Sequence, residues 1–403
     1  METRKKFTLG KGILYFLIVL VLGAAVYLLI PSNYFIHRAL IYQLPKIEHY
    51  KIFENRVIKA GNPQPWSFAK DYDKKVIPAT QQPYFDEMQT VAFVVIQHNQ
   101  VIFEKYWEDY NQTSKSNSFS MAKCILSLLV GCAIDDGYIK SVEEPVSHFL
   151  PEWTAFNGDT LRIKHLLTMS AGVDWDESYS SLFSKTTKAY YGNDLWSLAL
   201  TEKQIEKPGV KFNYQSGVSL MIAYLLKNAT GKTVSEYASE KLWTPIGAEE
   251  DALWSLDKKD GMEKAYCCFN SNARDFARLG QLILNKGMWN GKQVLDSNYI
   301  KAAITPATNL MYTPKPTPDG QTYNERPCTF YGYQFWIAQY NGLTVPYFRG
   351  ILGQYIFVIP ELDAVIVRLG HKRDATYNID QNRTIDVDVW LETGLQIINE
   401  STE

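Results

Sequence analysis

A long uncharged run near the amino terminus separates two very different parts of this sequence. The basic cluster Arg4-Lys5-Lys6 and Lys11 precede it, the 19 residues of Gly12–Ile30 carry no charge, and Pro31 closes the run. A helix needs about 20 apolar residues to cross the hydrocarbon layer of a membrane. We therefore expect a basic cytoplasmic stub at 1–11 and a transmembrane anchor at 12–30.

The flanking charges also predict the orientation of this anchor. Basic residues stay on the cytoplasmic side, so the chain after Pro31 should lie on the periplasmic or extracellular side of the cell membrane. A cleaved signal peptide is the alternative, but its apolar core is shorter and ends at a small-residue cleavage site. Here Gly23-Ala24-Ala25 lies inside the run, with Val26–Ile30 still to follow. This favours an uncleaved, single-pass anchor.

The composition narrows the classes of partner and site. Of 403 residues, 46% are hydrophobic and 21% charged, which is ordinary globular usage with room for a large core. Lys and Arg number 41 and Asp and Glu 43, a net charge of −2, so nucleic acid is not an expected partner. The six histidines show no His-x-x-x-His spacing and the five cysteines are sparse, so we expect no metal site and cysteines that serve packing.

Hydrophobic periodicity predicts an α+β fold. One hairpin is expected from Val91–Ile96 and Val101–Tyr106, and a second from Gln354–Ile359 and Ala364–Leu369. Helices are expected between them and at the end of the chain, at Met121–Ile134, Leu161–Met169, Val218–Lys227, Val234–Leu242, Ala273–Leu284 and 385–398. This order predicts a mainly antiparallel sheet flanked by helices, with an inserted helical subdomain. Residues 31–80 are expected to form a linker and irregular lead-in, before a domain at 81–403.

A candidate nucleophile opens the most apolar helix. Ser120 and Lys123 are almost one helical turn apart, so the amine should lie beside the hydroxyl. Burial in an apolar helix lowers the pKa of a lysine towards that of a usable base. Ser67–Lys70 and Ser255–Lys258 have the same spacing, but they lie in polar segments where the lysine would stay solvated. Spacing alone also fits a structural role, in which Ser120 caps the helix and Lys123 extends to solvent.

Acyl transfer from such a serine also needs a proton carrier for the leaving group. A tyrosine whose pKa is held down by a neighbouring lysine can act as base and then as acid. Tyr214, in a loop before a helix, and Tyr191 are both candidates from the residues alone. Motifs of other chemistries are missing, since the sequence has neither a Gly-x-Ser-x-Gly elbow nor a Gly-x-Gly-x-x-Gly loop.

Several segments, taken in order, resemble the serine β-lactamase and penicillin-binding-protein superfamily. The chain is most similar to its class C branch, and within that to 6-aminohexanoate-oligomer hydrolases and related esterases. The resemblance extends from about Phe93 to the terminal helix. It rests on the segments SFSMAKCILSLLVGCAIDDGYIKSVEEPVSHFLPEW, LRIKHLLTMSAGVDWDE, PGVKFNYQSG, NARDFARLGQLILNKGMW, YGYQFW and FRGILGQYIFVIPELDAVIVRLGHKR.

The resemblance implies roles for individual residues. Ser120 would be the acyl-accepting nucleophile and Lys123 its general base. Tyr214, rather than Tyr191, would pass a proton to the leaving group. Ser216 would hydrogen-bond the lysine or the substrate.

A second group of residues would bind the substrate. The backbone N–H of Gln354 would join that of Ser120 as an oxyanion donor, and Gly353 would let the backbone approach closely. Ile351 stands where relatives have a lysine or histidine, so the usual substrate-binding cation is missing there. Arg349 shares a strand face with position 351 and could replace that cation or form a structural salt bridge. The loop that walls the pocket in relatives matches a segment that could do so here, or could be a capped surface loop: Asp174, Trp175, Asp176, Glu177 and Tyr179.

We therefore expect a membrane-anchored serine hydrolase that cleaves an ester or amide through an acyl-enzyme on Ser120. Its substrate would be a small ester, amide or short peptide-like molecule, and no metal or organic cofactor is required. One alternative is a cell-wall D-peptidase or β-lactamase. It is disfavoured because Ile351 replaces the usual cation and Ser216 replaces the asparagine that is more usual in β-lactamases. A catalytically silent binding protein of the same fold is the other, and the intact serine, lysine and tyrosine argue against it.

Overall fold

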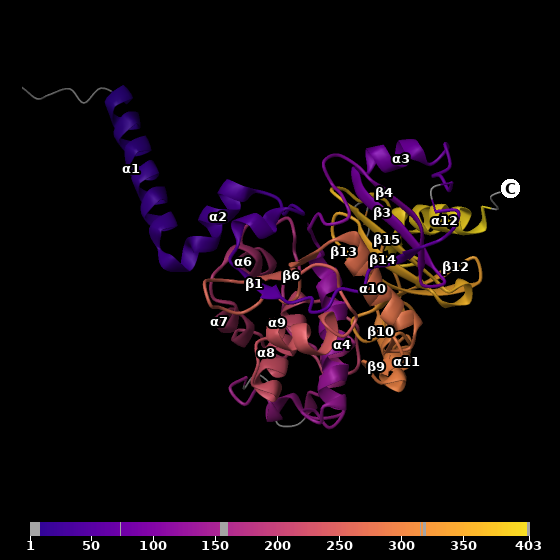
Figure 1. Ribbon diagram of the computed structural model, residues 1–403. Helices are drawn as coiled ribbons and strands as arrows, with labels where there is room; N and C mark the ends of the chain where they lie inside the picture. Colours follow the sequence, from indigo (N-terminus) through magenta and orange to yellow (C-terminus); the bar gives the residue numbers. More distant parts are fainter. Residues whose placement is uncertain (1–8, 73, 154–159, 315, 317–319, 401–403) are drawn as a thin grey trace, which may run out of the picture.

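A seven-stranded sheet forms one layer of the body of the protein (Figure 1). The structure, a computed structural model, describes residues 9–72, 74–153, 160–314, 316 and 320–400. The strand order is β12-β13-β14-β15-β3-β4-β2, and every pair is antiparallel except β2 with β4. The strands span Trp336–Tyr340, Leu343–Gly350, Gln354–Ile359, Ala364–Gly370, Thr90–Gln97, Gln100–Tyr106 and Ser67–Phe68. Both expected hairpins and the mainly antiparallel sheet are confirmed.

Two helices cover opposite faces of this sheet. A Cβ at Gly280 of α10 (Ala273–Leu284) would meet Val365, whereas a Cβ at Gly394 of α12 (Asp386–Asn399) would meet Ile366. Val365 and Ile366 are consecutive residues of β15, and consecutive strand side chains point to opposite faces. The two glycines therefore let one helix pack closely on each face.

The helical layer is built around α4 (Ala122–Asp135), which is buried from Ala122 to Ala133 and packs on α8 (Ser216–Thr230). Gly137, just after α4, has a positive φ of 78°, as expected of a glycine that ends a helix. Shorter helices surround this pair: α5 (Ile163–Leu167), α6 (Lys185–Tyr191), α7 (Leu195–Leu200), α9 (Val234–Ala238) and α11 (Ser297–Ala303). All of the expected helices are present, although 234–242 continues from α9 as a π-helical turn at Ser239–Trp243.

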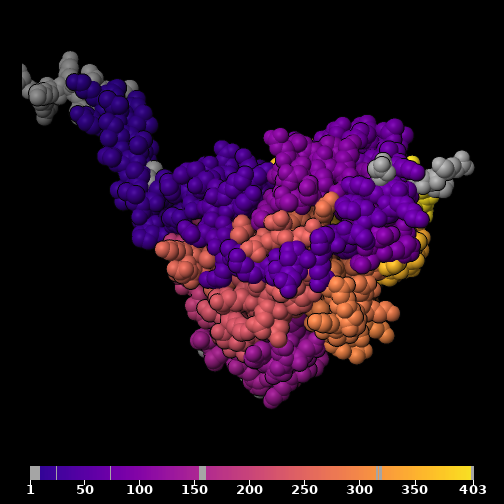
Figure 2. All heavy atoms as spheres, viewed as in Figure 1, coloured from indigo at the N-terminus to yellow at the C-terminus, as the bar shows by residue number. Residues whose placement is uncertain are grey.

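The segment 31–80 is more structured than the sequence suggested. Its helix α2 (Tyr34–Tyr42) buries Phe35, Ile36 and Ala39 and packs on α6. Its strand β1 (Asn55–Ile58) joins a four-stranded sheet with β6 (Ala252–Ser255), β7 (Phe269–Ser271) and β5 (Ser116–Asn117). Figure 2 shows this indigo segment lying across one face of the body. The elements are too short for hydrophobic periodicity to reveal, which is why a linker was expected.

Helix α1 (Leu9–Leu29) extends away from the body and ends before Pro31 (Figure 1). Its stretch Gly10–Leu29 is long and apolar enough to cross a membrane, and none of it is buried against other parts of the protein. A signal sequence near the amino terminus can also satisfy this criterion of length and hydropathy. The basic cluster at 4–6 lies outside the described residues.

One expectation about the cysteines was wrong. Cys267 and Cys268 form a disulfide, whereas Cys124, Cys132 and Cys328 are free and buried. Spacing rules consider cysteines that are separated in the chain, so they gave no signal for this adjacent pair.

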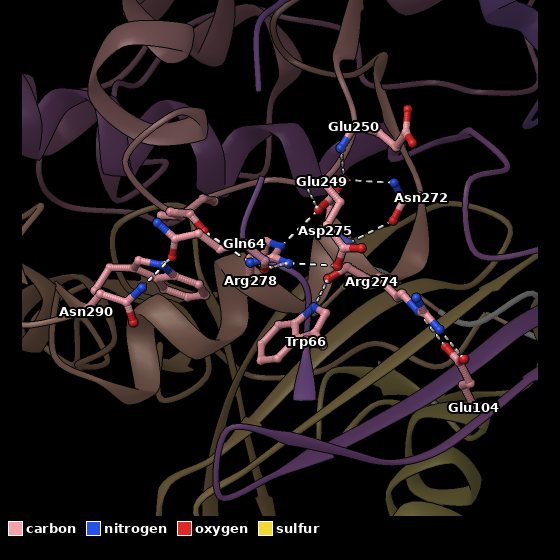
Figure 3. A network of polar contacts seen from close by, with 12 residues as sticks. Gln64, Trp66, Glu104, Glu249, Glu250, Asn272, Arg274, Asp275, Arg278 and Asn290 are labelled. Atoms are coloured by element: carbon pink, nitrogen blue, oxygen red, sulfur yellow. Dashed lines mark hydrogen bonds and ion pairs between the residues drawn. The ribbon is translucent and has the colours of Figure 1, made fainter. Parts of the chain in front are cut away.

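A buried polar network fastens α10 to the segment at Gln64 (Figure 3). The Asp275 carboxylate accepts hydrogen bonds from the backbone N–H groups of Glu249 and Glu250, at 2.8 and 3.0 Å, and pairs with Arg278 at 2.9 Å. Arg278 in turn donates to the Gln64 carbonyl at 2.6 Å. Because Asp275 is fully buried, its loss would leave two unpaired N–H groups in the core and would leave Arg278 with Glu249, at 2.8 Å, as its remaining carboxylate partner.

We predict that Asp275→Ala lowers the free energy of unfolding by about 3–5 kcal/mol, since it removes one partner of a buried ion pair. Urea denaturation of the full chain, followed by tryptophan fluorescence, measures this loss. The control is Asp380→Asn, which removes an exposed partner of Arg326 and should cost less than about 1 kcal/mol. Equal effects in the two variants would contradict the structural role of the network.

Candidate active site

Ser120 lies on a tight 3-10 turn, Phe119–Met121, between β5 and α4. Phe119 has a φ of 45°, a conformation that a bulky residue rarely adopts, and its N–H donates to the Asn117 side chain at 2.8 Å. Strand β13 passes close to this turn, because a Cβ at Gly350 would come within 2.2 Å of the Ser118 carbonyl oxygen. The turn therefore holds the Ser120 hydroxyl beside the edge of the large sheet.

The Lys123 amine is buried next to this hydroxyl. Its Nζ donates to Ser120 Oγ at 3.0 Å, to Ser216 Oγ at 3.2 Å and to the Tyr266 carbonyl at 2.8 Å. The side chain is 1% exposed, and desolvation lowers the pKa of Lys123 to about 8, while the charge of Glu177 acts in the opposite direction. Both protonation states of the amine are therefore accessible near neutral pH.

The other two Ser-x-x-Lys matches do not form such a pair. Ser67 lies on the exposed strand β2, and Ser255 is buried in strand β6. Among the residues that the structure describes, only the Ser120 hydroxyl accepts a hydrogen bond from the lysine of its own tetrapeptide. Helical geometry at 120–123, rather than the tetrapeptide itself, creates the contact.

Glu177, expected from the resemblance only as part of the pocket wall, also contacts the residues around Lys123. Its carboxylate accepts from the Ser216 N–H at 2.6 Å, from Ser216 Oγ at 2.7 Å and from the Tyr179 hydroxyl at 2.5 Å. Close packing brings Glu177 to Ser216. Gly217, the residue after Ser216, lies so near the Trp175 ring that a Cβ there would come within 2.3 Å of it. A chain of contacts thus runs from Glu177 through Ser216 and Lys123 to Ser120. Glu177 and Ser216 are 39 residues apart in the sequence, so local spacing does not predict the contact between them.

Tyr214 completes the group around Lys123. The lysine Nζ lies 5.1 Å from the centre of its ring, and the Ser120 side chain hydrogen-bonds the phenol. The rival Tyr191 lines a cavity that also contains Ser120, but its hydroxyl donates to the Gln43 carbonyl at 2.7 Å and contacts neither Ser120 nor Lys123 among the described hydrogen bonds. Burial raises the pKa of Tyr214 well above its ordinary value of 10.0, and the Glu177 charge raises it further. The expectation of a lowered tyrosine pKa was therefore wrong, since desolvation outweighs the Ser120 hydrogen bond and the Arg349 charge, which act in the opposite direction on the pKa of Tyr214.

Two cavities meet at Ser120. The first, of about 490 Å³, is lined mainly by apolar and aromatic side chains, among them Leu44, Phe119, Leu182, Tyr190 and Leu352, and we call it the apolar pocket. The second, of about 640 Å³, contains Arg349, Tyr214 and Trp336, and we call it the arginine pocket. Ser120, Tyr179, Ile351 and Arg373 line both. The hydroxyl therefore stands where the two cavities join.

Residues 80–387 match the family model described as Beta-lactamase. This chain belongs to the β-lactamase family. It is 25% identical to the 6-aminohexanoate-dimer hydrolase of Paenarthrobacter ureafaciens over 295 residues, which cover 70% of this chain and 73% of the relative.

Solved structures support the same fold. A candidate 6-aminohexanoate-dimer hydrolase from Bacillus anthracis superimposes with a TM-score of 0.71 at 20% identity, covering 88% of this chain and 92% of that one. A family VIII carboxylesterase superimposes with a TM-score of 0.61 at 15% identity, covering 83% and 99%. The resemblance inferred from the sequence is confirmed, and the protein is a serine hydrolase of the β-lactamase fold.

In this β-lactamase-family protein, Arg349 takes a position beside the site. Its guanidinium lies 4.7 Å from the centre of the Trp336 ring and donates to the Asn382 carbonyl at 3.2 Å. No carboxylate in the described ranges forms a salt bridge with Arg349. The structural salt bridge that was the alternative role for Arg349 is therefore not formed there. Arg349 instead lines the arginine pocket, on the same side of Ser120 as Tyr214.

The turn after β13 differs from the expectation for Gly353 and Gln354. Leu352 and Gly353 have φ values of 62° and 81°, and a Cβ at Gly353 would come within 2.2 Å of Arg368, so the glycine makes room for a buried arginine. The Gln354 side chain is buried and donates to the Gly370 carbonyl at 2.6 Å. Neither residue lines the two cavities at Ser120 in the part of the chain that is described, whereas Ile351 lines both.

Proposed function

We propose that the protein hydrolyses an ester or amide bond through an acyl-enzyme on Ser120. The observation that carries the proposal is the 3.0 Å contact between Ser120 Oγ and a buried amine whose pKa is about 8. A neutral Lys123 can accept the serine proton as the oxygen attacks a substrate carbonyl. A new C–O bond then forms, and the carbonyl oxygen becomes an oxyanion.

Backbone N–H groups would stabilise that oxyanion. Ser120 supplies the first, as expected from its place at the start of α4. For the second we replace Gln354 by Ile351, because Ile351 lines both cavities beside Ser120 and directly follows Gly350, which lies against the nucleophile turn. The two donors would then face the junction of the cavities from opposite sides.

Tyr214 would deliver the proton to the leaving group. Its raised pKa keeps the phenol protonated until a leaving oxygen or nitrogen with developing negative charge takes the proton. The tyrosine regains a proton from the Lys123 ammonium as the C–O or C–N bond breaks, which restores the neutral amine. Water then attacks the acyl-enzyme by the same steps in reverse and releases the acid. No step needs a further cofactor.

Ser216 and Glu177 would position and tune the base. Ser216 donates to Glu177 and accepts from Lys123, so it links the carboxylate to the amine. The negative charge of Glu177 favours the ammonium form that exists after the serine proton has been taken. Glu177 is thus a positioning residue that adjusts when Lys123 can act as a base.

The substrate class follows from the relatives and the cavities. One relative is named for an amide substrate, the 6-aminohexanoate dimer, and one structural neighbour is a carboxylesterase. We therefore propose a small ester or amide. Arg349 and Arg373 in the arginine pocket favour a carboxylate-bearing substrate as the second candidate, as in a cell-wall D-peptidase or β-lactamase. Acylation of Ser120 by a fluorescent penicillin would support this second candidate.

The first test is Ser120→Ala. We expect it to abolish turnover of p-nitrophenyl acetate and labelling by a fluorophosphonate probe, because both need the hydroxyl, while the melting temperature changes little. Ser67→Ala is the matched control, since Ser67 starts the same tetrapeptide on an exposed strand, and it should keep full activity. Activity that survives in Ser120→Ala would end the assignment.

A pH profile tests the base. We expect kcat/KM for p-nitrophenyl acetate to rise with pH through about 8, as Lys123 loses its proton. Glu177→Gln removes a charge that raises the pKa of Lys123, so the midpoint of the rise should move to lower pH. Asp176→Asn is the control, because Asp176 is an exposed neighbour on the same loop. A Glu177→Gln profile that loses amplitude with no shift of its midpoint would contradict the electrostatic role.

We also propose that Gly12–Ile30 is an uncleaved anchor that holds the hydrolase domain at the outer side of the membrane. Length and composition support this, and none of the residues of Gly10–Leu29 in the described chain is buried. The expected result is that the full chain stays in the membrane fraction after alkaline carbonate extraction, whereas a chain lacking residues 1–30 is released. External protease should digest the domain in spheroplasts. A mature chain that begins after Ala25 would show cleavage instead.

A further inference from the structure

The apolar pocket opens beside the segment that follows the candidate membrane span. Helix α1 contacts α2, and the end of α2 and the residues after it form part of the pocket wall, at Ala39, Gln43, Leu44 and Pro45. Figure 1 shows α1 leading directly into α2, above α6. One short segment therefore connects the end of the span to the active-site cavity.

Helix α2 exposes large apolar side chains on the face that does not pack on the body. Phe35, Ile36 and Ala39 are buried, whereas Leu40 and Ile41 are each 56% exposed, beside the polar His37. Leu44, just after the helix, is 74% exposed and also lines the pocket. Neighbouring exposed apolar residues mark a surface that is normally covered. Because α2 contacts the end of the candidate membrane span, a membrane surface is the cover that its position fits.

The pocket itself suits a hydrocarbon chain. Its volume of about 490 Å³ lies within the range of about 300–1,000 Å³ that is usual for small-molecule sites. Leu44, Leu182 and Leu352 line it, and the reactive hydroxyl of Ser120 shares the same cavity. Two cations, Lys372 and Arg373, also line this cavity, and Arg373 lies where it meets the arginine pocket. The three leucines belong to the apolar pocket alone and the Arg349 guanidinium to the arginine pocket alone, so the two cavities differ in the way that the two ends of an amphiphile differ.

We propose that the apolar pocket binds the hydrocarbon chain of an amphiphilic ester or amide, and that this substrate enters from the membrane surface beside α2. The proposal rests on the serine hydrolase activity and the anchor proposed above. The polar end of the substrate would lie in the arginine pocket, with the scissile carbonyl at Ser120. Each methylene that leaves water for such a pocket favours binding, so longer chains should be better substrates until the pocket is full.

Chain length tests the pocket. With the full chain in phosphatidylcholine nanodiscs, we expect kcat/KM to be at least tenfold higher for p-nitrophenyl octanoate than for p-nitrophenyl acetate. Leu44→Asp puts a charge at the mouth of the pocket and should reduce this ratio about tenfold. The control is Ile205→Asp, a substitution of a residue that is 63% exposed and lies outside the pocket, and it should keep the ratio.

A second measurement tests the route of entry. 4-Methylumbelliferyl oleate embedded in the same nanodiscs should be hydrolysed, and Ile41→Asp should slow this reaction at least fivefold while leaving acetate turnover unchanged. Octanoate turnover without oleate turnover would show that the chain comes from solution, which contradicts entry from the membrane. An octanoate-to-acetate ratio near one in the wild type would overturn the pocket assignment. Acetate turnover that depends on Ser120 would leave the hydrolase itself intact in either case.

Discussion

The buried Lys123 amine is the constraint on which the rest of the site depends. A lysine ammonium has three donors, and Ser120 Oγ, Ser216 Oγ and the Tyr266 carbonyl provide three acceptors within 3.2 Å. Burial without water penalises the charged form, yet these acceptors and the Glu177 charge stabilise it. The opposing effects bring the pKa of Lys123 to about 8. A more polar site would keep the amine protonated, and a drier one would prevent it from holding the proton taken from Ser120.

Two glycines allow the close backbone approaches that hold the groups around Lys123 in place. Gly350 allows β13 to lie against the Ser118 carbonyl, and Gly217 allows the Trp175 ring to pack on the start of α8. The first approach sets Ser120 beside Ile351, and the second brings Glu177 to Ser216. A Cβ at either glycine would come within 2.2 or 2.3 Å of the facing atoms, so the elements would have to move apart. The sheet, the helical layer and the loop before α6 therefore meet at one point because two residues have no Cβ.

Local patterns in the sequence were enough to predict part of this arrangement. The Ser120–Lys123 contact is fixed by helical geometry three residues apart, and the long apolar run after it indicated burial, so both could be read from adjacent residues. Tyr214 needed the family resemblance, because one tyrosine among 26 has no local mark. Glu177 and Ile351 depend on packing between distant segments, and spacing could not separate Ile351 from Gln354. The sign of the Tyr214 pKa shift also depends on burial in three dimensions. For the same reason the sequence did not predict α2 and β1. Their few apolar residues are recognised as buried only from the surfaces on which they pack.

The position of Ser120 between two unlike cavities links the proposed anchor to the proposed chemistry. An anchor alone would only raise the local concentration of the enzyme at the membrane. Here the segment after the span also forms one wall of the apolar pocket, at Leu44 and Pro45. The proposed anchor would therefore set the apolar pocket towards the lipid surface and leave the arginine pocket on the other side of Ser120. An amphiphile that leaves the bilayer with its polar end first would keep its hydrocarbon end towards the membrane throughout the reaction. Only its polar end would need to pass Ser120, and its scissile carbonyl would stop there.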